Sequence, residues 1–255
     1  MDVQAYLERI DISQMTPNYL FLEKLMNAHL RTIPFENLNV MAKKTLKLDQ
    51  DALFEKIVGQ SRGGFCYELN GLFSTLLHAL GFEVNIGAAY VFDDKKQKYS
   101  YVEDVYDHMV LFVQLERLYL VDVGFGDSVR TPISLPNGQV EDVSGQYRVV
   151  PTNPAKNAYE LQQKQYKGTW MPLYQFNLNY LTVNDFKYSC RWTETSPESH
   201  FTQRAVTTIA TKTGRITLTD HILTITTDKK KEKTTINNNE TRKQMLKKHF
   251  GIILP

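Results

Sequence analysis

The chain has 255 residues, of which 30 are basic, 28 are acidic and 42% are hydrophobic, so its formal net charge is +2. Such a balanced charge argues against binding to a phosphate backbone as the main activity, and no nucleic-acid partner is expected. No apolar run approaches the roughly 18 residues of a membrane span, and the N-terminus lacks a basic signal region. These features predict a cytoplasmic protein with no membrane association, and they leave the oligomeric state open.

Two cysteines are present, Cys66 and Cys190, together with six histidines. Two cysteines in a chain of this length indicate no disulfide framework, and their thiols are expected to stay reduced. Paired CxxC or similar metal-ligand spacings do not occur, so no metal-dependent mechanism is expected. Cys190 is interpreted as a packed thiol without a catalytic role.

The first 82 residues are predicted to form a helical domain. Apolar residues recur there at three- and four-residue spacing, which is the period of a helix with one buried face. The predicted helices cover residues 5–10, 18–32 and 49–61, and a fourth begins at Cys66 and ends near Gly81. Glycine just after the last apolar residue is a typical helix stop.

From residue 83 the pattern changes to short β-rich runs. Strands predicted at residues 84–92, 109–113, 118–123, 146–150, 159–163 and 170–176 suggest a barrel-like sheet over residues 83–185. Residues 186–255 are predicted to form an α/β lid, with a short helix at 197–201, strands at 205–211, 215–218 and 221–227, and a final helix at 239–250. The expected fold class is therefore α+β, with three domains: 1–82, 83–185 and 186–255.

The segment RGGFCYELNGLF, residues 62–73, places a cysteine where a flexible glycine pair ends and a helix begins. Free backbone N–H groups and the positive end of the helix dipole favour an anion in the first turn, so the pKa of Cys66 is expected to lie below its usual value of about 8.5. A thiolate of this kind can act as a nucleophile. A lone cysteine is more often a small buried hydrophobe, so the interpretation requires a neighbouring base.

The predicted base is His108, at the start of a β-hairpin whose second strand carries Asp122. If the loop has an odd number of residues centred on Leu115, His108 lies opposite Asp122 and both side chains share one face of the sheet. A two-residue loop at Leu115 and Glu116 would instead turn Asp122 to the other face. Asp122 follows an apolar run, where a carboxylate rarely lacks a partner, and an imidazole would supply one.

Cys66, His108 and Asp122 together fit a nucleophilic triad, in which histidine takes the thiol proton and aspartate orients the imidazole. Their order along the chain resembles the papain and transglutaminase type of core. A transglutaminase-like or papain-like cysteine hydrolase, which would attack amides without CoA, therefore stays open as an alternative. So does a non-catalytic binding module that kept the fold.

Several motifs together resemble the arylamine N-acetyltransferase family. The family's hallmark segment matches almost letter for letter around Cys66. Further matches are YLERI at 6–10, IPFENL at 33–38, HMV at 108–110, LVDVGFG at 120–126 and, more weakly, TSPESHF at 195–201. The strong matches lie in roughly the first half of the chain. The segment at 93–107 looks longer than is usual in the family.

The resemblance implies a ping-pong acetyl transfer. Cys66 would attack the thioester of acetyl-CoA, hold the acetyl group as a thioester, and yield it to a small aromatic amine or hydrazine, as in xenobiotic metabolism. The chemistry suits cysteine, because exchange of one thioester for another is nearly balanced in energy and leaves a reactive intermediate. A serine ester would be more inert.

The same resemblance suggests which residues contact the substrates. Gly124 and Gly126 are expected to let the backbone approach acetyl-CoA, because glycine permits close approach. Trp192 and Ser199 are expected near the same acetyl donor. Phe125 and Phe92 are expected to line the aromatic acceptor pocket.

Two charged features admit alternative interpretations. Arg62, Glu36 and Asn37 are expected to form a polar network that fixes the glycine loop below Cys66, as in the family, although they could be ordinary surface residues. The lysine-rich run at residues 228–233 is interpreted as a solvated hairpin tip, with steering of anionic CoA as the alternative. The histidines other than His108 are interpreted as surface or packing residues.

Overall fold

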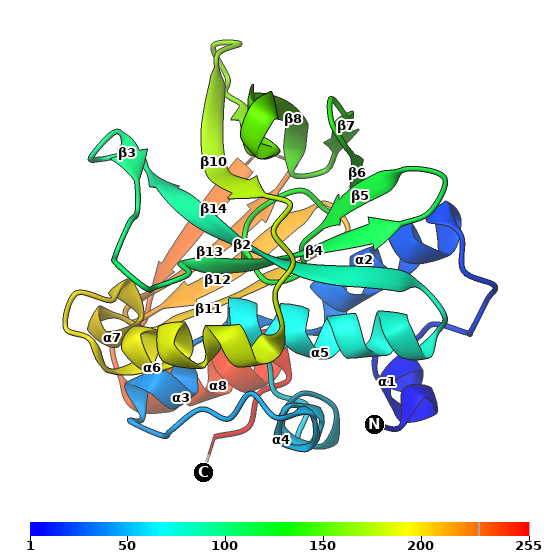
Figure 1. Cartoon of the computed structure of the whole chain (residues 1–255). Coiled ribbons are helices and arrows are strands. Elements are labelled where there is room, and N and C mark those ends of the chain that lie inside the picture. The colour runs from blue at the N-terminus through cyan, green and yellow to red at the C-terminus, as the bar shows by residue number, and fades with distance from the viewer. Residues whose placement is uncertain (229, 255) are drawn as a thin grey trace.

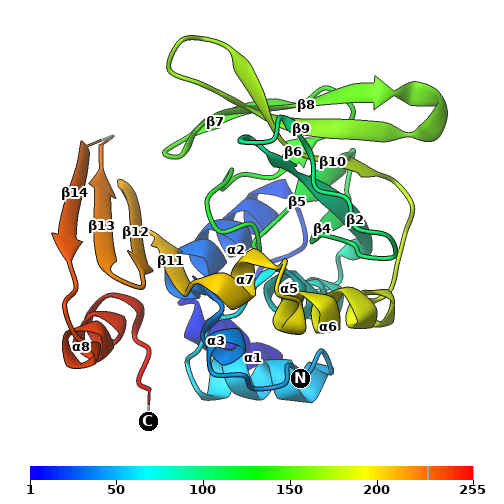
Figure 2. The same cartoon turned by 90° about the vertical axis from the view of Figure 1, so that its left-hand side faces the viewer.

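A layer of helices and two β-sheets make up the part of the chain that the computed structural model describes, residues 1–228 and 230–254. The larger sheet lies above the helices of the N-terminal third (Figure 1). The smaller sheet stands to one side of both, with the C-terminal helix against it (Figure 2). The expected mixed α+β class, with a barrel-like central sheet, is confirmed.

The predicted N-terminal helices are present, and a short helix that was not predicted, α3 (Leu38–Met41), is added to them. The predicted ones are α1 (Val3–Arg9), α2 (Tyr19–Thr32), α4 (Gln50–Phe54) with a π-helical continuation (Glu55–Gly59), and α5 (Cys66–Ala79). Side chains satisfy free N–H groups where helices begin: Asn18 accepts a hydrogen bond from the N–H of Phe21 ahead of α2. Gly81, with φ of 90°, follows the end of α5 in the left-handed region that glycine tolerates.

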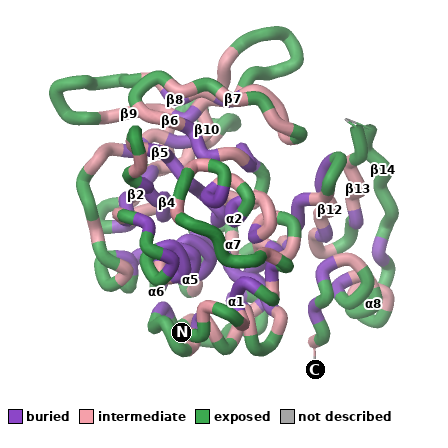
Figure 3. The backbone as a smooth tube through the Cα atoms, turned by 90° about the vertical axis from the view of Figure 1, so that its right-hand side faces the viewer, coloured by how far each residue is buried: buried purple, intermediate pink, exposed green. Residues whose placement is uncertain are grey.

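Helix α5 is buried far more completely than its sequence suggests. The spacing predicts one buried face, yet eleven of its 14 residues are buried. The reason is that helices pack on one side of α5 and strands β2 (Glu83–Asp93) and β4 (His108–Gln114) pack on the other. Figure 3 shows the buried backbone concentrated along this helix and the adjacent strands. Any side chain on α5 is therefore held in a rigid setting.

The larger sheet has nine antiparallel strands and curls into a nearly closed barrel. The order is β6-β5-β4-β2-β10-β9-β8-β7, with β3 paired to β2. Strand β6 at one end contacts β7 and β8 at the other, which brings the sheet close to closure. The remaining bounds are β3 (Lys98–Tyr99), β5 (Leu118–Val121), β6 (Ile133–Ser134), β7 (Gln139–Asp142), β8 (Gly145–Asn153), β9 (Ala158–Lys164) and β10 (Trp170–Asn177).

The smaller sheet is built mostly from the C-terminal third. Its order is β1 (Phe35–Glu36), β11 (Val206–Ala210), β12 (Gly214–Thr219), β13 (Ile222–Thr227) and β14 (Lys230–Thr235), and α8 (Asn239–Phe250) packs against it. Helices α6 (Lys187–Thr195) and α7 (His200–Gln203) connect it to the barrel. Of the lysine-rich run, Asp228 lies in the β13–β14 turn and residues 230–233 belong to the fully exposed edge strand β14, while Lys229 lies outside the described residues.

Two apolar clusters correspond to these regions. The large one is continuous between the N-terminal helices and the barrel, and it includes Cys66. The small one joins the smaller sheet to α8 and to Leu38 of α3. The predicted site residues Cys66, His108 and Asp122 all lie where helix α5 meets the barrel.

Candidate active site

The β4–β5 hairpin brings His108 and Asp122 together, although not in the predicted register. Gln114 pairs with Leu118 across a three-residue loop, and Leu111 pairs with Val121 instead of the predicted Tyr119. The shift is two residues, and an even shift keeps every side chain on its face. His108 and Asp122 are therefore diagonal neighbours on one face, and the distance from His108 Nε2 to Asp122 Oδ2 is 2.7 Å.

Asp122 is held from several directions. Its Oδ1 accepts hydrogen bonds of 2.9 Å from the side-chain amide of Asn70 and from the backbone N–H of Gly124. Its Oδ2 contacts His108, and both side chains of this pair are almost fully buried. With Nε2 directed at a carboxylate, the neutral imidazole carries its proton on Nε2, which leaves Nδ1 as the acceptor.

Cys66 is the first residue of α5, and it is 3% exposed. The backbone N–H of Phe65 donates to Glu68 Oε2 at 3.2 Å, which fixes the start of the helix. Gly124 packs directly against Cys66: a Cβ added to Gly124 would lie 2.8 Å from the Cys66 Cα atom. The glycine is thus required by packing against α5, a reason that the sequence did not reveal.

The pKa of Cys66 departs from its expectation. Burial raises the pKa of the thiol well above its usual value, and nearby Asp107 and Asp122 act in the same direction. The backbone of Met109, the neighbour of His108, lowers the pKa of the thiol, but only in part. Desolvation disfavours the thiolate more than the helix start favours it. Formation of a thiolate at Cys66 would therefore require a base, and the Met109 backbone that lowers the pKa of the thiol belongs to the residue after His108.

Asn70 is a site residue that the sequence analysis missed. Its side-chain amide donates to Asp122 Oδ1 and to the backbone carbonyl of Met109 at 2.7 Å, and its Oδ1 accepts from the backbone N–H of Val123 at 2.9 Å. It follows Cys66 by four residues, so both side chains share one face of α5. A signal was present, because an asparagine at that spacing inside an apolar helix must find polar partners.

Aromatic rings surround the histidine. The rings of Phe125 and Tyr174 have centroids 5.2 Å and 5.3 Å from that of His108. Tyr174 is completely buried, and burial together with Asp122 raises the pKa of its phenol. No local pattern around Tyr174 pointed to this position, because β10 reaches the site only through the sheet order. The rings restrict the orientation of the imidazole.

Phe125 also connects the histidine to a cavity. A cavity of about 330 Å³ is lined by both predicted acceptor residues, Phe92 and Phe125, together with Asp94, Gln165, Met171, Pro172 and Leu173. Aromatic and apolar walls with a few polar groups are typical of small-molecule sites.

The residues expected near acetyl-CoA are more dispersed. Gly126 has φ of 92°, and a Cβ there would lie 3.4 Å from the ring of Phe35. Ser199 is buried, and its hydroxyl accepts a hydrogen bond from the N–H of Phe201 at the start of α7. Trp192 lies half-buried on α6. The ring of Phe201 is 5.6 Å from that of Phe65, so the segment with Ser199 lies near the start of α5.

Part of the expected polar network is present below the glycine loop. Arg62 donates to Glu36 Oε1 at 2.7 Å and to Asn39 Oδ1 at 3.1 Å. The network thus fixes the segment before α5. The prediction that Asn37 belongs to this network was wrong. Its side-chain amide instead donates hydrogen bonds to the backbone carbonyls of Phe201 and Arg204. Asn37 thereby holds the segment between α7 and β11, where its Oδ1 also accepts a hydrogen bond of 2.8 Å from the backbone N–H of Val206.

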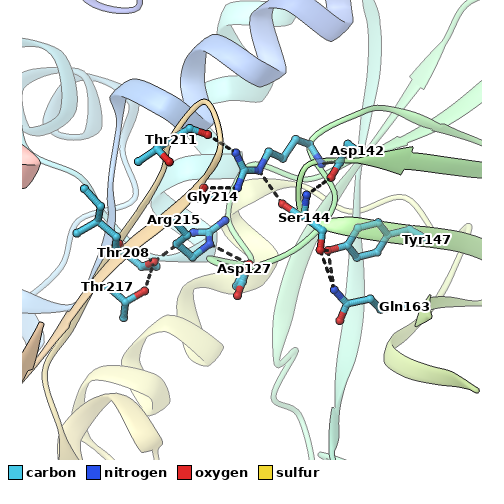
Figure 4. Close-up of polar contacts among 12 residues, drawn as sticks. Asp127, Asp142, Ser144, Tyr147, Gln163, Thr208, Thr211, Gly214, Arg215 and Thr217 are labelled. Atoms are coloured by element: carbon cyan, nitrogen blue, oxygen red, sulfur yellow. Dashed lines mark hydrogen bonds and ion pairs between the residues drawn. The ribbon is translucent and has the colours of Figure 1, made fainter. Parts of the chain in front are cut away.

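The β5–β6 connection fastens the smaller sheet to the barrel. The Arg130 guanidinium donates to the backbone carbonyls of Thr211 and Gly214, at 2.6 and 2.5 Å, and to Ser144 Oγ. Arg215 of β12 donates to Asp127 Oδ1 at 2.8 Å, two residues beyond Phe125 (Figure 4). The loop that carries Phe125 is therefore joined to the smaller sheet.

The described residues carry neither a metal-ligand cluster nor a membrane-spanning helix. Among residues 1–228 and 230–254, histidine, cysteine and carboxylate side chains do not gather in groups of three or more that could hold a metal ion. Within the same ranges, no helix has the length and apolar character needed to cross a membrane.

Known proteins resemble this chain in sequence and in fold. A family model described as N-acetyltransferase matches residues 20–255. Arylamine N-acetyltransferase 1 of Homo sapiens is 31% identical over 234 residues, which cover 84% of this chain and 79% of the relative. Arylamine N-acetyltransferase 1 of Bos taurus is 30% identical, over 100% of this chain and 95% of the relative.

Solved structures agree with the sequence matches. The arylamine N-acetyltransferase of Salmonella typhimurium has a TM-score of 0.91 at 28% identity, over 98% of this chain and 90% of that one. An arylamine N-acetyltransferase of Bacillus cereus has a TM-score of 0.91 at 26% identity, over 100% of both chains. The Bacillus enzyme is described as having a unique Cys-His-Glu catalytic triad, whereas His108 here pairs with an aspartate. By the extent of these matches, the chain belongs to the arylamine N-acetyltransferase family.

Proposed function

We propose that this chain transfers the acetyl group of acetyl-CoA to arylamines and arylhydrazines through an acetyl thioester on Cys66. The observation that carries the proposal is the 2.7 Å contact between His108 and Asp122 on the strand beside the start of α5, in a chain of this family. The catalytic roles are Cys66 as nucleophile, His108 as base and acid, and Asp122 as the orienting carboxylate.

In the first half-reaction, His108 Nδ1 accepts the proton of Cys66 as the sulfur attacks the thioester carbonyl of acetyl-CoA. The bond from the acetyl carbon to the CoA sulfur then breaks, and the CoA thiolate takes the proton from the imidazolium. Asp122 stabilises that imidazolium through Nε2. A buried thiol with a raised pKa is consistent with this order of events, because it becomes nucleophilic only as its proton leaves.

In the second half-reaction, the amine nitrogen attacks the acetyl carbon on Cys66. The bond from that carbon to the Cys66 sulfur breaks, the nitrogen loses a proton to His108, and the sulfur recovers a proton from it. The products are the acetylated amine and the free thiol, so the enzyme is regenerated. No water enters the balance, which separates this reaction from hydrolysis.

Substrate contacts are part of the proposal. The cavity lined by Phe92 and Phe125 supports them as the acceptor pocket. Gly124, Gly126, Trp192 and Ser199 are proposed to lie along the path of acetyl-CoA, supported by the position of the Gly124–Gly126 loop against Cys66 and of the Ser199 segment near Phe65. We also propose a cytoplasmic location, which would keep the two free thiols reduced.

Initial rates measured at several concentrations of acetyl-CoA and of aniline or phenylhydrazine test the mechanism. We expect parallel double-reciprocal lines and one acetylated amine for each CoA released. Intersecting lines would exclude the acetyl-enzyme route. Release of CoA without acetylated amine, or cleavage of amides without CoA, would support the cysteine hydrolase instead.

A further inference from the structure

The cavity beside Phe125 forms where two hairpins of the barrel separate. Strands β2 and β10 pair from Ala89 with Phe176 to Val91 with Tyr174. Beyond this point β2 turns back into β3, whereas β10 continues with β9, and Leu173 is an extra residue in that pairing. A bulge of this kind bends a strand and redirects its side chains. The two arms diverge visibly in Figure 1. The residues that line the cavity come from both arms and from Phe125.

The two ends of this cavity differ in chemistry. Phe125 lies at the end nearest the triad, because its ring contacts that of His108. Phe92 and the β10 side chains form apolar walls that suit a flat ring. Asp94 lies at the other end, in the β2–β3 turn, and it carries the only charge among the described lining residues.

The length of the strand sets the size of an acceptor that could reach Asp94. Ala89 pairs with His108, and Asp94 follows it by five residues, which is about 16 Å at roughly 3.3 Å per strand residue. A single aniline ring cannot span that distance. An aniline with a substituent chain opposite its amino group can extend along most of it, so the far end of such an acceptor approaches the carboxylate.

The surrounding charges leave the Asp94 carboxylate available. Its Oδ1 accepts one hydrogen bond, at 3.0 Å, from the side-chain amide of Gln97. Of the lysines in the same hairpin, Lys96 is paired with Asp93 at 3.4 Å, and Lys95 and Lys98 are exposed. On the facing arm, the Lys164 amino group lies 5.9 Å from the centre of the Trp170 ring.

We infer that Asp94 is a specificity residue that favours elongated arylamines with a cationic group at the end opposite the reacting amine. The inference rests on the proposed function, because it assigns one end of the acceptor to the acetyl-Cys66 thioester. Acceptors with an anionic substituent at that position are disfavoured by the same carboxylate. The neutral ring and the amine itself contribute no such preference.

Two isosteric acceptors test the inference. One is the para-aminobenzamide of N,N-dimethylethylenediamine, which is cationic at neutral pH, and the other is the para-aminobenzamide of isopentylamine, which is neutral. For the wild-type enzyme we expect KM to be about two- to fivefold lower for the cation, as is typical of a partly exposed charge pair. Asp94→Asn should abolish this preference by raising the KM of the cation to about that of the neutral acceptor, and Asp94→Lys should reverse it.

Glu103→Gln is the matched control, because Glu103 is exposed in the segment between β3 and β4 and does not line the cavity. It should keep the wild-type preference. Equal KM values for the two acceptors in the wild type, or a preference that survives in Asp94→Asn, would overturn the inference. Aniline is assayed in parallel: failure to acetylate aniline or either benzamide would refute the proposed function itself, whereas turnover without charge preference refutes only the role of Asp94.

Discussion

The helix and barrel region and the smaller sheet are held in different ways. Apolar packing joins α5 to the barrel in one continuous cluster, and Cys66, His108 and Asp122 lie within or against it. The smaller sheet has its own small cluster, and polar contacts through Asn37, Arg130 and Arg215 fasten it to the rest. The difference indicates that the first region fixes Cys66, His108 and Asp122. The second region instead holds the loop that carries Phe125 in place.

The largest effect is expected inside the first region, at Asp122. Asp122→Asn keeps the shape of the side chain but removes the charge that stabilises the His108 imidazolium, so kcat/KM should fall about a thousandfold or more. Alkylation of Cys66 by iodoacetamide near neutral pH should slow as well. A variant with the wild-type pH profile for alkylation would contradict the orienting role of Asp122.

His29 should make the stability of the first region dependent on pH. It is completely buried, its Nδ1 is 2.8 Å from the Tyr6 hydroxyl, and burial lowers its pKa from 6.5 to about 3. Between these values the unfolded chain binds a proton that the folded chain does not. The free energy of unfolding should therefore decrease as the pH falls from 6.5, by about 3 kcal/mol at pH ~4, and level off below the folded pKa.

Urea unfolding at several pH values measures this dependence. In His29→Gln the decrease should be about 3 kcal/mol smaller than in the wild type over the same range. His78→Gln is the control, because His78 is an exposed residue of α5 and its replacement should leave the curve unchanged. If the wild type and His29→Gln show parallel curves, His29 is not the source of the pH dependence.

Arg130 tests the attachment of the smaller sheet. Arg130→Met removes hydrogen bonds to the carbonyls of Thr211 and Gly214, of which the Gly214 carbonyl keeps a backbone donor, the N–H of Thr211. The change should cost about 2–3 kcal/mol. Hydrogen exchange should accelerate in the β11–β12 hairpin and remain slow in α5. Equal acceleration in both regions would show that they unfold as one unit.

The smallest effect is expected at Asp127, whose side chain is 73% exposed although it pairs with Arg215. An exposed partner contributes about 1 kcal/mol or less. Asp127→Asn should therefore change kcat/KM less than about fivefold, in contrast to the same replacement at Asp122. A loss as large as that of Asp122→Asn would mean that the smaller sheet participates directly in positioning the triad.

Helices with clear local signals at their ends were predicted accurately from the sequence. The final helix occupies residues 239–250 as expected, and the helix that begins at Cys66 starts at that residue. The hairpin register was wrong by two residues because the loop is centred one residue later than assumed, yet the shared face survived the error. Helix α6 was missed although its sequence is amphipathic, because two of its three buried residues, Ser189 and Thr193, are polar.

The remaining features depend on tertiary packing. The raised pKa of Cys66 could not be foreseen, because the sequence shows the helix start but not the depth of burial. Tyr174 and Arg130 reach their partners through the sheet order and the contact between the two regions, respectively. Asn70 was within reach of sequence reasoning, because its spacing from Cys66 indicates a shared helix face.

The most direct test of the central claim is the intact mass of the purified protein after mixing with acetyl-CoA alone, with Cys66→Ser treated in parallel. We expect one acetyl adduct on the wild-type chain that maps to Cys66, is absent from Cys66→Ser, and disappears as acetylated aniline forms. The claim would be contradicted by an adduct on another residue, or by acetylated aniline formed at the wild-type rate by Cys66→Ser.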